Sequence, residues 1–83
     1  MIKKANFKLK VKEKEIIEKE IYTDYITLSD FLKFCDIAQT GGHAKILIQE
    51  GEVKVGGEVC LQRGKKLRKG DEVEFDRKIY RLI

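Results

Sequence analysis

The segment from Arg63 to Lys69, with the sequence "RGKKLRK", carries five basic side chains in seven residues. The guanidinium groups of Arg63 and Arg68 match the geometry of phosphate better than ammonium groups do, so one interpretation is that this segment binds a polyanion. Leu67 is its one apolar residue and can anchor the segment to a core, which would hold Lys66 and Arg68 in place. The alternative is a solvated loop that only aids solubility, and composition alone leaves both interpretations open.

A second candidate for phosphate binding is the segment "TGGHAK" at residues 40–45. Glycines at a helix N-terminus leave backbone N–H groups accessible, and the positive end of the helix dipole favours an anion there. The predicted phosphate seat consists of Thr40, Gly41, Gly42, His43 and Lys45. The alternative is that the two glycines only permit a tight turn between helices, and the residues alone do not separate the two interpretations.

Catalysis and metal binding are not indicated by the remaining reactive side chains. The chain has one histidine, two cysteines and no CxxC pair. A dyad of His43 and Cys35 is disfavoured because His43 follows two glycines at a helix start, whereas Cys35 falls on an apolar helix face. A protein metal site needs three or four His or Cys ligands, or an oxygen cage. We therefore expect no enzyme activity, no cofactor and no metal, and we expect Cys35 and Cys60 to be reduced.

Size and charge limit the function further. A chain of 83 residues supports one domain with a small core. Its formal net charge of +4 is modest, but it is unevenly distributed, at +3 over residues 1–20, −3 over 21–62 and +4 over 63–83. The sequence shows neither a membrane span nor a signal peptide, so the cytoplasm is the expected compartment and no membrane partner is expected.

The elements that must position these residues begin with two short helices. Thr27 and Asp30 form a capping-box pattern, and Ile26 can pack on Phe31, so a helix is expected to begin at Thr27 or Leu28. A second helix is expected after Thr40, with Gly51 as its left-handed stop. The apolar faces predicted for the two helices consist of Leu28, Phe31, Leu32 and Cys35, and of Ala44, Leu47 and Ile48.

Short strands are expected on both sides of the helices. Phe7, Leu9 and Val11 alternate with lysines, which predicts an edge strand guarded against aggregation. Residues 13–20 fit either a strand or a helical turn, and 21–26 favour extended backbone. After the helices, strands are expected at 53–55, 59–61, 73–75 and 79–83, with glycine turns at 56–57 and 70–71 and the basic segment as a loop.

These elements predict an α+β fold in which two short packed helices are followed by a small antiparallel sheet, with an N-terminal strand extension. The expected boundary divides the chain into an extension at 1–25, placed on the sheet, and a domain at 26–83. The chain shows no internal repeat and no low-complexity linker.

From Thr27 to Phe75 the chain resembles the S-four RNA-binding domain, or alpha-L motif, named after the fourth protein of the small ribosomal subunit. The segments that carry the resemblance are "ITLSDFLKF", "TGGHAKILIQEGEVKVGGEV" and "RGKKLRKGDEVEF". The central segment has the hydroxyl residue, the Ala and basic residue on a helix, the glycine stop and the Val-x-Val of that family. The resemblance is closest to stand-alone bacterial proteins that consist of little more than this domain.

The resemblance implies non-enzymatic binding of structured RNA, ribosomal RNA or its precursor, through phosphate and shape contacts. It also implies ribosomal or assembly proteins as possible further partners, and a monomer is expected. The RNA-binding residues that it indicates are Lys33, Thr40, Gly41, Gly42, His43, Lys45, Arg63, Lys65, Lys66 and Arg68.

The chain departs from the family at several positions. Family members often carry Arg in place of Gly41, and its loss removes a phosphate clamp. They often carry Asn in place of Gly56. Glu50 and Glu52 should repel phosphate near the end of the second helix. An alternative function is a protein-interaction module whose basic loop docks on an acidic protein partner, and competition between RNA and that partner would distinguish the two.

Overall fold

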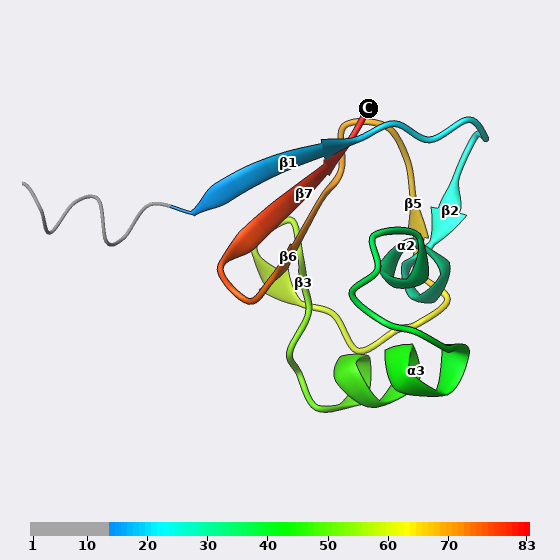
Figure 1. Ribbon diagram of the computed structural model, residues 1–83, viewed down its shortest axis with the longest axis vertical. Helices are drawn as coiled ribbons and strands as arrows, with labels where there is room; N and C mark the ends of the chain where they lie inside the picture. Colours follow the sequence, from blue (N-terminus) through cyan, green and yellow to red (C-terminus); the bar gives the residue numbers. More distant parts are fainter. Residues whose placement is uncertain (1–13) are drawn as a thin grey trace, which may run out of the picture.

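The computed structural model describes residues 14–83, and their elements form the α+β fold that the sequence predicts (Figure 1). The predicted strand around Phe7 lies outside these residues. The elements in chain order are β1 (Glu15–Lys19), β2 (Ile26–Thr27), α2 (Leu28–Phe34), α3 (Gly41–Gln49), β3 (Lys54–Val55), β4 (Glu58–Val59), β5 (Lys66–Leu67), β6 (Glu72–Phe75) and β7 (Lys78–Leu82).

Both helices begin at the predicted hydroxyl caps. The Thr27 hydroxyl accepts from the Asp30 backbone N–H at 3.4 Å, and the Thr40 hydroxyl accepts from that of His43 at 3.0 Å. Each cap pairs an N–H that has no partner within its own helix. Gly51 has a φ of +76° just after α3, which confirms the left-handed stop. The two helices pack against each other through their apolar faces.

The larger sheet has five strands in the order β1-β7-β6-β3-β4. Gly56 and Gly57, with φ values of +60° and +90°, close the β3–β4 hairpin as predicted, and Asp76 and Arg77 close the β6–β7 hairpin with φ values of +52° and +67°. β1 lies parallel to β7, so the sheet is mixed and not wholly antiparallel. The whole chain between the two strands serves as the long connection that a parallel pair requires.

The sequence predicts the basic segment as a loop, but two of its residues form a strand. Lys66 and Leu67 form β5, which pairs antiparallel with β2 through Ile26 opposite Leu67 and Thr27 opposite Lys66. We refer to this pair of strands as the β2–β5 ribbon. A strand of two residues has no alternation that a sequence pattern could reveal, and only the burial of Leu67 shows why it forms.

The core joins the helices to the sheet and the ribbon. The β2–β5 ribbon and the two helices lie on one side of the molecule, and the long strands β1, β7 and β6 lie on the other (Figure 1). Neither helix within residues 14–83 has the length and hydrophobicity that a membrane span requires. The fully buried side chains of largest volume are Phe31, Leu28, Leu32, Ile48, Leu67, Leu82, Val53 and Val73.

Candidate functional site

The start of the basic segment is fixed to the first turn of α2. The backbone N–H of Leu28 donates to the Lys65 carbonyl oxygen at 2.8 Å, and that of Ser29 donates to the Arg63 carbonyl oxygen at 3.1 Å. N–H groups in the first turn of a helix have no partner within the helix. The segment therefore caps α2 with its backbone while its basic side chains stay exposed.

The end of the segment is fixed as well. Leu67 is 0% exposed, which confirms its predicted role as the anchor to the core. Beyond β5, the Arg68 backbone N–H donates to a carboxylate oxygen of Asp71 at 2.8 Å, and the Asp71 N–H donates to the Arg68 carbonyl oxygen at 3.0 Å. The backbone that carries the exposed side chains of Lys66 and Arg68 is thus hydrogen-bonded both before and after these residues.

Two of these cations lie over the ring of Tyr25. The sequence did not indicate Tyr25 as a site residue. Its ring centroid lies 4.9 Å from Lys66 Nζ and 5.8 Å from Arg68 Cζ. Contacts of this kind at exposed sites contribute about 0.5 to 1 kcal/mol each. The antiparallel register places Tyr25, next to Ile26, beside the β5 side chains. The only signal in the sequence was an aromatic residue two positions before the cap Thr27.

The start of α3 offers donors of a different kind. The Nδ1 atom of His43 accepts from the Gln39 backbone N–H at 3.3 Å, so the neutral ring carries its proton on Nε2 and can donate from there. Neither Gly41 nor Gly42 has a positive φ. A Cβ atom would meet nothing within 4 Å at Gly41 and only the Thr40 hydroxyl, at 3.9 Å, at Gly42. The turn between the helices therefore does not require glycine, whereas close approach of a ligand to the backbone would.

The ten residues indicated by the sequence are all exposed, and nine of them lie in two groups joined by the packing of α2 on α3. Lys33 lies in the last turn of α2, from which the chain leads to α3, and its ammonium group pairs with Asp30 at 3.3 Å. One group, at the ribbon and the start of α2, consists of Arg63, Lys65, Lys66 and Arg68. The other, at the start of α3, consists of Thr40, Gly41, Gly42, His43 and Lys45.

The cysteines and the histidine are not arranged as a nucleophile and base. Burial raises the pKa of the Cys35 thiol to about 11, so the reactive thiolate is scarce at neutral pH. Cys35 and Cys60 are both free thiols. The Nδ1 atom of His43 is already occupied by Gln39. Within residues 14–83, no three His, Cys, Asp or Glu side chains cluster as metal ligands.

Comparisons with known proteins identify a family and a relative that match this chain. Residues 19–83 match the S4 domain, which is the S-four domain of the resemblance. The chain is 48% identical over 56 residues to the probable ribosome maturation protein RlbA of Bacillus subtilis (strain 168), a match that covers 68% of this chain and 79% of that protein.

The fold is also found in a solved structure. The 30S ribosomal protein S4e from Thermoplasma acidophilum superimposes with a TM-score of 0.54 at 23% sequence identity. The match covers 72% of this chain and 32% of that protein, so the likeness is one of fold over a third of the larger chain. The two helices, the Val-x-Val strand with its glycine turn and the closing basic segment all fall within the range matched by the family, and the chain belongs to the S4 domain family.

Proposed function

We propose that this protein is a non-enzymatic RNA-binding protein that docks on structured RNA, ribosomal RNA or its precursor, through phosphate and shape contacts. The observation that carries the proposal is the fixed backbone of the basic segment, which caps α2 at one end and pairs with β2 at the other. Cations on an ordered backbone lose less conformational entropy on binding than cations on a mobile loop. The segment is therefore better suited to recognition than to solubility alone.

The shape of this surface suits folded RNA. The major groove of A-form RNA is too deep and narrow for side chains to enter, so proteins recognise its backbone and its wide minor groove. The β2–β5 ribbon and the start of α3 offer guanidinium groups, ammonium groups and accessible backbone N–H groups for such contacts. Membership of the S4 domain family and the ribosomal names of both relatives support ribosomal RNA or its precursor as the target. The proposal includes a cytoplasmic location, a monomeric state, and ribosomal or assembly proteins as possible further partners.

A salt titration tests the proposal directly. Binding to a structured ribosomal RNA fragment and to duplex DNA is measured for the wild type and for a variant with Arg63, Lys65, Lys66 and Arg68 changed to Gln. Loss of four phosphate contacts should flatten the plot of log affinity against log salt by about three units. RNA should bind more tightly than DNA. A control with the same net charge changes Lys14, Lys54, Arg77 and Lys78 to Gln, and its slope should fall by less than about one unit. An unchanged slope in the first variant would overturn the proposal.

One observation favours the alternative of a protein partner. Val59 and Leu61, in the segment that leads into Arg63, are 51% and 62% exposed. Exposed apolar side chains beside a basic segment suit an acidic protein with an apolar centre. If the Gln variant kept its RNA affinity while Leu61→Ser lost capture of an acidic assembly protein, this second function would replace the first.

A further inference from the structure

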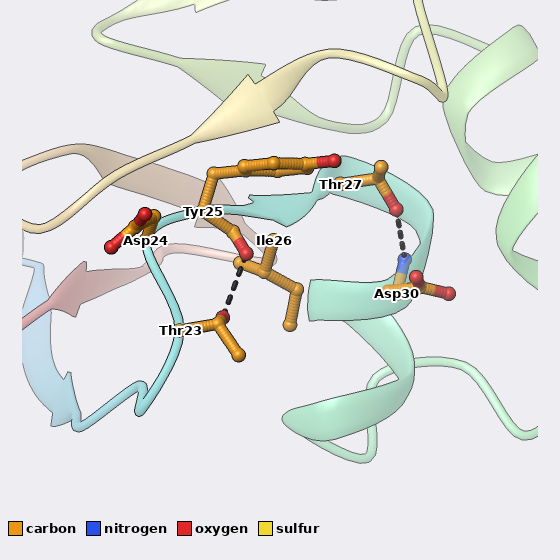
Figure 2. Close-up of a pocket in the computed structure, with 6 residues that line it drawn as sticks. All are labelled: Thr23, Asp24, Tyr25, Ile26, Thr27 and Asp30. Carbon is orange, nitrogen blue, oxygen red and sulfur yellow. Dashed lines mark hydrogen bonds between the residues drawn. The ribbon is translucent and has the colours of Figure 1, made fainter.

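An open hollow of about 620 Å³ lies beside Tyr25, on the β2 side of the ribbon. Its lining comes from one continuous stretch of chain and the first turn of α2. Figure 2 shows the Tyr25 ring edge-on above Ile26, with Asp24 at one end and Thr27 and Asp30 at the other. The volume falls in the range of small-molecule pockets, which is about 300 to 1,000 Å³. The residues that line it are Thr23, Asp24, Tyr25, Ile26, Thr27 and Asp30.

The chemistry of the lining selects a planar ligand that donates hydrogen bonds. The Tyr25 ring and the Ile26 side chain supply apolar surface, on which a flat heterocycle can stack. The carboxylates of Asp24 and Asp30 only accept hydrogen bonds. Asp30 already pairs with Lys33 at 3.3 Å, whereas Asp24 makes no side-chain hydrogen bond or salt bridge within the described part of the chain. The Thr23 hydroxyl donates to the Tyr25 carbonyl oxygen at 2.7 Å and holds the rim in shape.

The charges around the hollow suit the two ends of a nucleotide. Its own carboxylates repel phosphate; Lys66 and Arg68 do not line it but lie over the Tyr25 ring, with Nζ and Cζ 4.9 and 5.8 Å from the ring centroid. A nucleotide with its base in the hollow can therefore place its phosphate on these cations. The Watson–Crick edge of guanine presents adjacent N–H donors that match one carboxylate. Uracil presents a single N–H donor there, flanked by two carbonyl oxygens that a carboxylate repels.

We propose that this hollow receives one unstacked base of the bound RNA, guanine in preference to uracil, which stacks on Tyr25 and donates to Asp24. The inference rests on the proposed function and adds a point of base recognition to an otherwise phosphate-directed surface. Unstacked bases in loops and bulges are the usual targets of sequence-specific RNA recognition.

The first test is a nuclear magnetic resonance titration of the full chain with guanosine 5′-monophosphate and with uridine 5′-monophosphate. The guanosine nucleotide should shift the backbone amides of residues 23–27 and Asp30, and should bind more tightly than the uridine nucleotide. Tyr25→Leu should weaken guanosine nucleotide binding at least about five-fold, as loss of a stacked base does, and Tyr25→Phe should retain it. Tyr22→Leu is the matched control, because Tyr22 is 84% exposed and does not line the hollow.

The second test separates base reading from simple repulsion. If Asp24 accepts from guanine, Asp24→Asn should erase the preference for the guanosine nucleotide, because an amide offers one acceptor and one donor. If Asp24 only repels phosphate, the same change should strengthen both nucleotides alike, and the inference is then wrong. Equal binding of the two nucleotides to the wild type, or shifts confined to Lys66 and Arg68, would also overturn it.

Failure of this inference can be told apart from failure of the proposed function. A protein whose affinity for the structured ribosomal RNA fragment depends on Arg63, Lys65, Lys66 and Arg68, but whose hollow ignores both nucleotides, binds RNA through phosphates alone. Tyr25 is 42% exposed, so its variants should keep the fold, and circular dichroism at 222 nm checks this.

Discussion

Cys35 shows at the scale of one residue how burial controls the chemistry of a thiol. Burial, the largest cause, raises its pKa from 9.0 to about 11; Lys19 lowers it and Asp36 raises it. Between these two values the unfolded chain releases the thiol proton while the folded chain keeps it. The contribution to stability is therefore complete below pH 9 and is lost as the pH rises toward 11.

We expect the free energy of unfolding of the wild type to fall over this pH window, and to fall less in Cys35→Ala. Urea unfolding at a series of pH values from 7 to 11 measures both curves. Some decline should persist in the variant, since burial also raises the pKa of Tyr80. Cys60→Ala is the control and should decline in parallel with the wild type. A parallel decline in Cys35→Ala would contradict the account.

The residues that could be identified from the sequence either have partners close by in the chain or stand out by their residue type. Thr27 and Thr40 cap N–H groups three residues away, and Leu67 is a single apolar side chain among charges. Tyr25 could not be identified, because its cationic neighbours Lys66 and Arg68 come some forty residues later. The same distance hides the capping of α2 by backbone carbonyls of the basic segment.

At the scale of elements, substitutions at the start of α3 can distinguish an effect on stability from an effect on RNA affinity. Alanine in place of Gly41 or Gly42 meets no steric obstacle, and neither glycine has a positive φ. Because glycine costs about 0.5 to 1 kcal/mol relative to alanine in a helix, both variants should be equally or more stable than the wild type. If phosphate approaches the backbone here, their affinity for the ribosomal RNA fragment should nevertheless fall.

We expect the double variant Gly41→Ala/Gly42→Ala to lose about three-fold or more in affinity, the equivalent of roughly one net hydrogen bond. Thermal unfolding and RNA titration of the same preparation give the two readouts. The control is Gln49→Ala, an exposed change at the opposite end of α3. Gain of stability with unchanged affinity would remove the start of α3 from the binding surface.

The helices and the glycine hairpin were predictable as elements, whereas the β2–β5 ribbon and the placement of β1 were not. A helix of seven or nine residues repeats its apolar face, and paired glycines mark a turn. β2 and β5 have two residues each, which is too few to show a period of two. The sequence EIIEK of β1 carries two adjacent apolar residues and no alternation, so its strand form depends on pairing with β7.

At the scale of the whole molecule, two cations at the ribbon differ from the paired cations of the sheet. On the sheet, Arg81 pairs with Glu72 at 2.8 Å and Lys14 pairs with Glu74 at 2.9 Å. Within residues 14–83, the side chains of Lys66 and Arg68 form no salt bridge and lie against Tyr25 instead. The 13 basic and 13 acidic side chains of residues 14–83 cancel in sum, so the positive potential at the ribbon is local and would act on a polyanion at short range.

For the whole molecule, we predict that the chain from β1 to α2 folds together with the rest of the protein. Ile21 is 3% exposed, its N–H donates to the Ile83 carbonyl oxygen at 3.0 Å, and Ile83 N–H donates to the Lys19 carbonyl oxygen at 2.9 Å. These contacts tie the chain before α2 to the last strand. The predicted boundary between residues 25 and 26 would then separate two segments that fold together.

Ile21→Ala should destabilise the protein by about 2 to 4 kcal/mol, as loss of a buried aliphatic side chain does, and should lower the midpoint of helix unfolding. Urea unfolding followed at 222 nm measures that midpoint, because the signal comes chiefly from α2 and α3. Ile16→Ala is the control: Ile16 is 51% exposed, and its replacement should change stability by no more than about 0.5 kcal/mol. If Ile21→Ala left the helix midpoint where it is in the wild type, residues 14–25 would be an independent extension, and residues 26–83 would be stable without them.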